Sequence, residues 1–145
     1  MEYHLVESDK YSIKIYPSIS YLEYRLKPGV IIDVEDVLRG KKEVTRLCPN
    51  QKFFVLAESE EFFRVTRDAR KVTSTFEYSD NTRCIAFYTK NFSVAMLGEL
   101  YNKINKPAIP TKMFSNRDSA KEWLWKQMKI PSSFQKQNDL QEQDE

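Results

Sequence analysis

The sequence predicts an α/β domain with a mixed sheet, in which the elements follow the order ββαβαβαβα. Two alternating segments, residues 11–16 and 19–26, come first and form an antiparallel hairpin. Short continuous apolar runs follow at 53–57 and 84–88, and such runs suit strands that are covered on both faces. Amphipathic segments separate the runs, and this alternation implies parallel strands joined by crossover helices. We expect about five strands and about four helices.

Length and composition indicate one folded domain at residues 1–130. The chain has 145 residues, of which 41% are hydrophobic, enough for one sizeable core. Residues 1–10 look like a loosely held end. Residues 131–145 are rich in Gln, Ser, Asp and Glu, and we expect them to form a disordered tail. The net charge of +2 divides into −3 in this tail and +5 in the body.

The first half of the chain has clear boundary signals. Pro17 and Ser18 form the turn of the hairpin, whose second strand is more apolar on the face of Leu22, Tyr24 and Leu26 than on the other. A helix begins after Asp33, which caps it, and an acidic first turn containing Asp36 suits the helix dipole. Gly40 weakens this helix, and Pro49 with Asn50 ends it. The apolar stripe of the helix consists of Val34, Val37, Leu38, Thr45 and Cys48.

The second half repeats the strand–helix unit. Thr66 caps a helix whose buried face carries Ala69, Val72, Thr73 and Phe76. Asn91 caps a further helix that ends before Pro107. Residues 110–114 form a short edge strand, and Ser115 with Asp118 forms a capping box for a last helix. That helix packs Ala120, Trp123, Leu124 and Met128 inward, which leaves Trp125 partly exposed.

Several classes of protein are excluded by the composition. A body charge of +5 falls far short of the basic footprint of a duplex DNA binder, so we expect no nucleic-acid partner. No apolar run approaches the roughly 18 residues that span a bilayer, and the start lacks a secretory signal. Cys48 and Cys84 stand alone, which suits free thiols in a reducing cytoplasm.

No cofactor, metal site or catalytic constellation is visible in the sequence. Three glycines do not make a phosphate loop, and His4, the single histidine, sits in the N-terminal end. Glu58, Glu60 and Glu61 follow a core strand, where ligands of open α/β sheets usually bind, but we expect them to form a solvated acidic loop.

The chain resembles the STAS-like domains, the fold of bacterial anti-sigma-factor antagonists, and in particular the short bacterial STAS-like proteins of unknown function. The resemblance covers roughly residues 11–128. The segments that carry it are 24–33 (YRLKPGVIID), 65–70 (VTRDAR), 104–107 (INKP), 110–114 (PTKMF) and 120–124 (AKEWL).

The resemblance implies one candidate switch. Antagonists of this type are regulated by phosphorylation of a Ser or Thr at the start of a helix that follows a central strand, and Thr66 is the most similar position here. The usual Asp-Ser-Ser-Gly-like sequence is absent, and Val65-Thr-Arg-Asp stands in its place. A phosphate there would meet free N–H groups and the guanidinium groups of Arg64, Arg67 and Arg70.

These observations favour a non-catalytic, cytoplasmic regulatory or protein-interaction module, with an unidentified protein partner and homodimerisation through a helix or the edge hairpin. The alternative is a domain that binds a small ligand, a lipid or a nucleotide, at the strand ends near Ser59, Thr66, Thr89 and Asn91. An enzyme comes third, and would need Glu58 or Glu61 desolvated in a cleft. A nucleic-acid binder comes fourth, and would need a continuous basic groove with exposed aromatic side chains.

Overall fold

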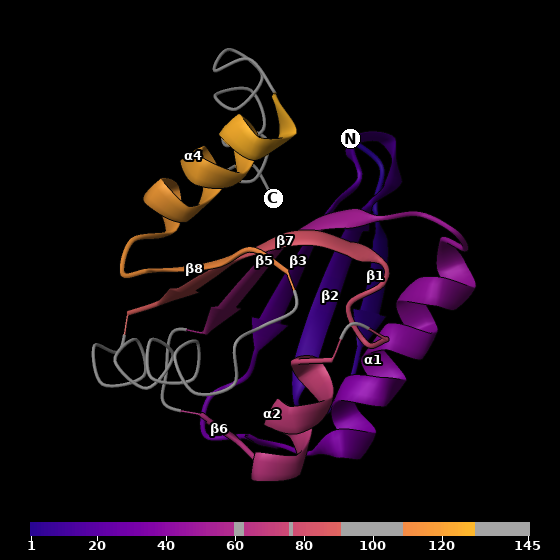
Figure 1. The fold of residues 1–145 in the computed structure, drawn as a ribbon, viewed down its shortest axis with the longest axis vertical. Coiled ribbons are helices and arrows are strands. Elements are labelled where there is room, and N and C mark those ends of the chain that lie inside the picture. The colour runs from indigo at the N-terminus through magenta and orange to yellow at the C-terminus, as the bar shows by residue number, and fades with distance from the viewer. Residues whose placement is uncertain (60–62, 76, 91–108, 130–145) are drawn as a thin grey trace.

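The computed structural model describes residues 1–59, 63–75, 77–90 and 109–129. A six-stranded sheet with the order β1-β2-β3-β5-β7-β8 forms its centre (Figure 1). Strand β2 is antiparallel to both of its neighbours, β1 and β3, and β3, β5, β7 and β8 run parallel, as predicted. The strands are β1 (His4–Glu7), β2 (Tyr11–Tyr16), β3 (Tyr21–Leu26), β5 (Phe53–Ser59), β7 (Thr82–Thr89) and β8 (Thr111–Phe114).

The N-terminal end is part of the sheet, so the prediction of a loosely held end was wrong. Strand β1 pairs with β2 along its whole length, from His4 opposite Ile15 to Glu7 opposite Ser12. A tight turn makes this possible, because the Ser8 N–H donates to the Tyr11 carbonyl at 2.9 Å. The sequence did not clearly indicate this hairpin, because the turn residues Asp9 and Lys10 are not a common pair in two-residue hairpin turns.

A second, two-stranded sheet leads the chain into two helices. Strand β4 (Ile31–Ile32) pairs in parallel with β6 (Arg64–Val65). The N–H groups of Arg64 and Thr66 donate to the carbonyls of Val30 and Ile32, both at 2.9 Å. This pairing places the starts of the two helices side by side. Strands of two residues are too short to produce a periodic signal, and the sequence did not predict them.

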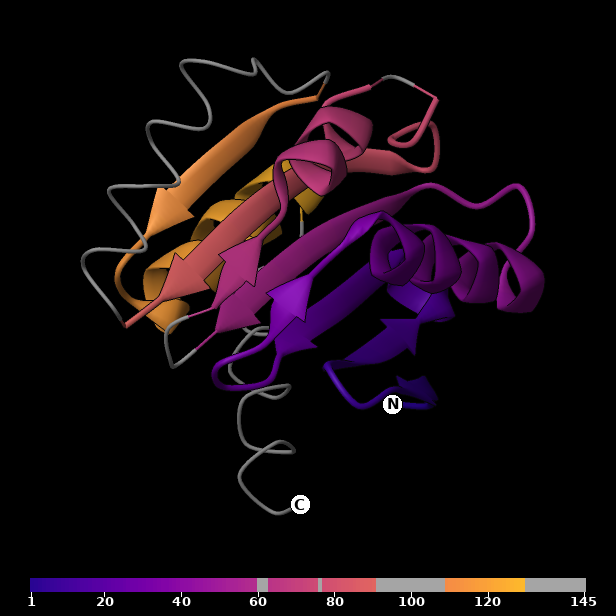
Figure 2. The same cartoon turned by 90° about the horizontal axis from the view of Figure 1, so that it is seen from below.

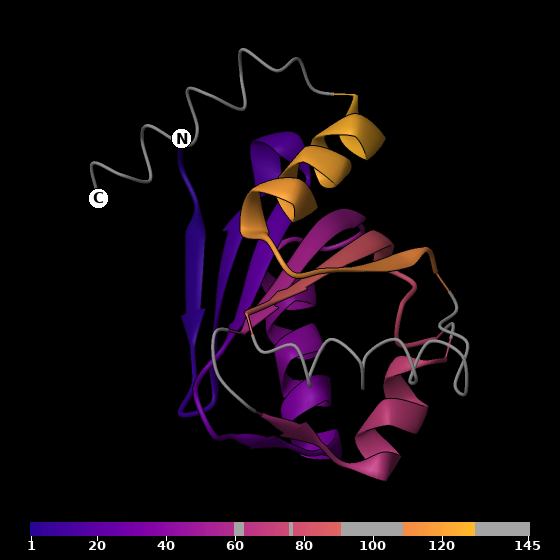
Figure 3. The same ribbon diagram turned by 90° about the vertical axis from the view of Figure 1, so that its left-hand side faces the viewer.

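Helices cover both faces of the large sheet (Figures 2 and 3). Helices α1 (Val34–Leu47) and α2 (Arg67–Thr73) lie on one face, and α4 (Arg117–Met128) lies on the other. The predicted helix that starts at Asn91 lies outside the described residues, as does the tail at 131–145. The cap of α4 is Asn116, whose side chain accepts from the Ser119 N–H at 3.0 Å, and the predicted cap at Ser115 was one residue early.

Helix α1 begins with the predicted cap and packs closely on the sheet. Asp33 and Asp36 form a reciprocal capping box, in which each carboxylate accepts from the backbone N–H of the other residue. Gly40 faces the rings of Tyr24 and Tyr11, and a Cβ there would lie 3.3 Å from the Tyr24 hydroxyl. The glycine that weakens the helix locally therefore lets it approach the sheet.

Asp36 links stability to pH. Partial burial opposes ionisation of this carboxyl, but the Asp33 N–H and the Lys10 ammonium, at 2.6 Å, outweigh it, so its pKa is lowered. A lowered folded-state pKa gives stability that is complete above the unfolded pKa, about 3.9, and is lost as pH falls through the folded value. Urea denaturation should show Asp36→Asn less stable than wild type at pH 7, with a difference that shrinks below about pH 4. Asp9→Asn, at an exposed position, should lower the free energy of unfolding at pH 7 by less than Asp36→Asn does. Equal losses for the two variants at pH 7 would contradict the assignment.

The sheet has a separate hydrophobic core on each face. Under α1 and α2, Ile13, Leu22 and Val55 pack with Val37 and Ala69. Under α4, other residues form the second core: Tyr16, Tyr21, Leu56, Cys84, Ala86, Tyr88, Ala120, Leu124 and Trp125. Trp125 is only 2% exposed, so the prediction of partial exposure was wrong. Its ring meets Tyr21 edge-on, with centroids 4.9 Å apart.

Candidate functional site

Charged side chains are buried between the sheet and the start of α4. Glu23 on β3 and Glu58 on β5 are each 4% exposed. The parallel register sets Glu58 opposite Arg25, and Glu23, Arg25 and Glu58 share the α4 face of the sheet because side chains alternate along each strand. Arg117, in the first turn of α4, lies over them. These four residues, with Lys121 one turn further along α4, are called the buried charge cluster below.

The cluster is a chain of alternating charges. Glu58 accepts through Oε1 from Nε and Nη2 of Arg25, at 3.0 and 2.8 Å. Its Oε2 accepts from Nε of Arg117 at 2.8 Å. Arg117 then donates through Nη2 to Oε2 of Glu23 at 2.6 Å. One guanidinium thus joins two strands to the helix above them, and both oxygens of Glu58 are engaged.

Burial and charge act in opposite directions at Arg25. Its partial burial lowers the pKa, but the ion pair and hydrogen bond with Glu58 outweigh that effect and raise the pKa of the guanidinium. Lys121 has no exposed surface, and its Nζ lies 5.7 Å from the ring centroid of Trp125. In the cluster, two buried carboxylates, Glu23 and Glu58, are paired with the guanidinium groups of Arg25 and Arg117, which are partly exposed. Such sets hold elements in register at a desolvation cost, and losing one member leaves a buried charge uncompensated.

The prediction of a solvated acidic loop was wrong for Glu58, which lies inside β5, while Glu60 and Glu61 lie outside the described residues. Sequence reasoning missed the whole cluster. One signal was present: Glu23 and Arg25 alternate with apolar residues in a strand, on the same face as Tyr21. A strand that is covered on both faces must bury such charges, and buried charges require partners.

The predicted site residues fall into two separate groups. Ser59 and Thr89 lie opposite each other in the register of β5 and β7, and neither has exposed surface. Thr66 caps α2, with Arg67 exposed in the first turn and Arg70 donating through Nη1 to the Val65 carbonyl at 3.3 Å. The sixth residue, Asn91, lies outside the described residues. The cluster occupies the other face of the sheet, because Glu58 and Ser59 point in opposite directions.

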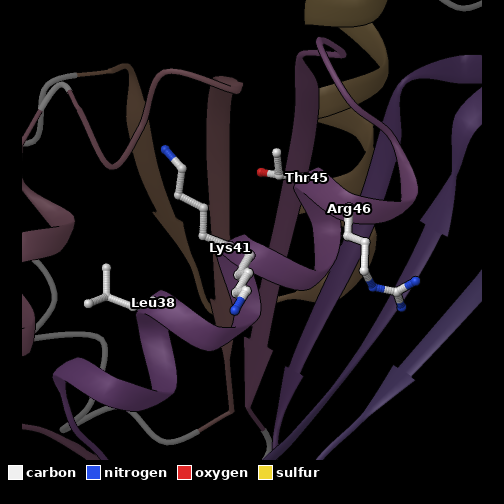
Figure 4. Close-up of a pocket in the computed structure, with 5 residues that line it drawn as sticks. Leu38, Lys41, Thr45 and Arg46 are labelled. Carbon is white, nitrogen blue, oxygen red and sulfur yellow. The ribbon is translucent and has the colours of Figure 1, made fainter.

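An open surface depression of about 450 Å³ lies along the outside of α1 (Figure 4). Among the described residues, its lining comes from this helix: Leu38, Lys41, Lys42, Thr45 and Arg46. Lys41 is held by the carbonyls of Glu77 and Tyr78 and by the Asp80 carboxylate, each at 2.6 Å. Leu38 is 49% exposed, and Lys42 is exposed beside it. The depression therefore combines an apolar side chain with positive charge.

Both cysteines in the described part of the chain are buried thiols. Burial raises the pKa of the Cys84 thiol to about 11 and also raises that of Cys48, and both thiols are free and buried. No group of His, Cys, Asp and Glu side chains among the described residues could hold a metal ion. None of the described helices is long and apolar enough to cross a membrane.

Residues 17–128 match the model of a protein family, DUF7793, which is described as a domain of unknown function. The chain belongs to the DUF7793 family. No curated protein matches it. Among solved structures, the domain is similar to an uncharacterised DUF3478 family protein with a SpoIIAA-like fold from Shewanella loihica PV-4. The TM-score is 0.53 at 12% identity, and the match covers 85% of this chain and 92% of the other. The predicted STAS-like fold is confirmed.

Thr66 has a structural role in this DUF7793 domain. Its hydroxyl oxygen accepts from the Ala69 N–H at 3.1 Å at the start of α2. Thr66→Ala should therefore lower the free energy of unfolding by about 1 kcal/mol, as measured by urea denaturation. Thr66→Ser keeps the capping oxygen and should recover most of the loss. If the alanine and serine variants were equally unstable, the cap would not be the reason.

Proposed function

We propose that this DUF7793 chain is a non-catalytic regulatory module that acts by binding another protein. The observation that carries the proposal is the pairing within the buried charge cluster. In open α/β sheets, ligands usually bind at the carboxyl ends of the strands, where Glu58 ends β5 together with Ser59. Here Glu58 is held by Arg25 and Arg117, and its charge serves to attach α4.

The surface over α1 and α2 is the best-supported contact surface for a partner. The two helices lie side by side on one face of the sheet (Figure 2). Leu38 and Lys42 line the depression on α1, and Arg67 and Arg70 are exposed on α2. An exposed leucine bordered by cations suits a partner that presents an apolar side chain within an acidic rim.

Thr66 is a candidate for regulation of this surface. It lies at the start of α2, next to Arg67 and one turn from Arg70. A phosphate on its hydroxyl would replace the cap and pair with these guanidinium groups, which would change the charge presented to a partner. Thr66→Asp should then alter partner binding while Thr66→Ala changes mainly stability.

The decisive experiment has two steps. Full-length protein is immobilised and exposed to a native lysate, and a protein that is retained saturably is purified and titrated against the free chain by calorimetry. Leu38→Glu and Lys42→Glu should each raise the dissociation constant by about tenfold or more, because both place negative charge in the contact. Glu122→Lys, which reverses an exposed charge on α4 at the other face of the sheet, serves as the control.

Two results would overturn the proposal. One is that no protein is retained saturably. The other is that the retained protein binds both α1 variants as tightly as it binds wild type, which would remove this surface from the contact.

Binding of a lipid or nucleotide at the strand ends has less support. Ser59 and Thr89 have no exposed surface, and the described depression lies on α1 instead. Residues 60–62 and 91–108, which follow the two strands, are outside the described part of the chain.

A further inference from the structure

We propose that two copies of this chain pair through strand β1, so that the sheet continues from one copy into the other. Strand β1 is the last strand of the sheet on its side, and no described element lies beyond it (Figure 3). Such an edge presents unpaired N–H and C=O groups that can template another strand. This inference does not depend on the partner surface over α1.

The hydrogen-bond alternation of β1 shows which backbone groups point away from β2. In an antiparallel pair, residues that exchange hydrogen bonds alternate with residues that do not. The Ser8 N–H donates to Tyr11, so Ser8, Val6 and His4 direct their backbone groups toward β2. The backbone groups of Tyr3, Leu5 and Glu7 therefore point outward from the sheet.

These three outward-facing residues can pair with the same three residues of a second copy, with Leu5 at the centre. In an antiparallel pair of two copies related by a twofold axis, Leu5 faces Leu5 of the second copy, and Tyr3 faces Glu7 of the second copy. Each residue in this register directs its N–H and C=O away from β2, so the three pairings can form six backbone hydrogen bonds. The backbone groups of β1 are therefore arranged to pair with strand β1 of a second copy.

The side chains on the same face support this register. Leu5 is 51% exposed, and Tyr3 is exposed beside it. The Lys14 ammonium lies 4.9 Å from the Tyr3 ring centroid, so the Glu7 carboxylate of the second copy would approach a positive charge. Tyr3 also contacts Tyr16, and Tyr16 contacts Tyr21 on the α4 face of the sheet. Pairing would bury the exposed leucine and complete a charge contact at each end.

Strand β1 lacks most features that protect edge strands from pairing. Residues 1–9 contain neither proline nor lysine, and the register of β1 with β2 has no bulge. The strand is short, so the contact area is below that of a standard protein interface. We therefore expect a dimer that dissociates reversibly with a dissociation constant in the micromolar range.

Sedimentation equilibrium of the full chain tests the proposal. Between about 1 and 500 µM, the mass should rise from 17.2 kDa toward twice that value. Leu5→Lys places two like charges on the axis and should weaken association by about tenfold or more. Leu5→Pro removes an outward N–H without removing one that bonds to β2, and should have the same effect. Leu38→Lys, at similar exposure on α1, should associate like wild type.

Disulfide formation tests the register. Paired Leu5 residues would have Cα atoms about 5.5 Å apart, which a disulfide can bridge. Under mild oxidation Leu5→Cys should give a covalent dimer on a non-reducing gel, while Glu7→Cys and Leu38→Cys should not. The proposal is overturned if wild type stays monomeric at every concentration, or if both Leu5 variants have the same dimer dissociation constant as wild type. It is also overturned if Glu7→Cys cross-links in place of Leu5→Cys. Circular dichroism at each step confirms that the variants are folded.

Discussion

Replacing Glu58 with alanine is expected to lower the free energy of unfolding by about 3 to 5 kcal/mol. The carboxylate is buried and accepts three hydrogen bonds from two guanidinium groups. Its removal takes away the carboxylate of Arg25 and leaves Arg117, under α4, with Glu23 in place of two carboxylates. Breaking a buried ion pair by removing one partner is strongly destabilising. Urea denaturation followed by circular dichroism measures the loss.

The controls for this prediction separate burial from charge. Glu43 also binds an arginine, Arg46, at 2.8 Å, but on the surface of α1, so Glu43→Ala should cost less than about 1 kcal/mol. Within the cluster, Arg117→Ala should cost more than Arg25→Ala, because the Arg117 side chain is 27% exposed and that of Arg25 is 60% exposed. Equal losses for Glu58→Ala and Glu43→Ala would contradict the role of the cluster.

Replacing Trp125 with alanine is expected to cost about 3 to 5 kcal/mol. The indole fills the core between α4 and the sheet, where its ring lies against Tyr21 and 5.7 Å from the Lys121 ammonium. Its buried N–H has no hydrogen-bond partner among the described residues, so the loss comes from packing and the cavity that remains. The measurement is again the midpoint and slope of urea denaturation.

Trp123 provides the matched control on the same helix. It is only half-buried and contacts Phe114, with centroids 5.9 Å apart. Trp123→Ala should therefore cost clearly less than Trp125→Ala. The reverse order would mean that α4 is rotated so that Trp123, as the sequence analysis expected, and not Trp125 fills the core.

The local elements were predictable because their signals are local. The alternation at residues 11–16 and 19–26 identified the hairpin, and the apolar runs identified β5 and β7. Asp33 and Thr66 cap the helices expected of them, because a side chain reaches only the N–H groups three residues ahead. Where the signal was weak or absent, as in β1, β4 and β6, the element was missed.

The buried charge cluster was not predictable in the same way. Arg117 and Glu23 are separated by 94 positions and meet only because α4 crosses the face of β3 and β5. Glu58 reads as the first residue of an acidic loop when only its neighbours are considered. The orientation of α4 decided that it became a buried ion-pair partner.

The sequence alone determined the class of the fold, the order of most of its elements and the caps of α1 and α2. These depend on hydrophobic periodicity and on side-chain contacts within a few residues. Tertiary structure decided that β1 is an outer strand, that Trp125 is core, and that Glu23 and Glu58 are paired under α4. Each of these depends on which face another element covers, and burial and ion pairing arise only when segments distant in the chain are brought together.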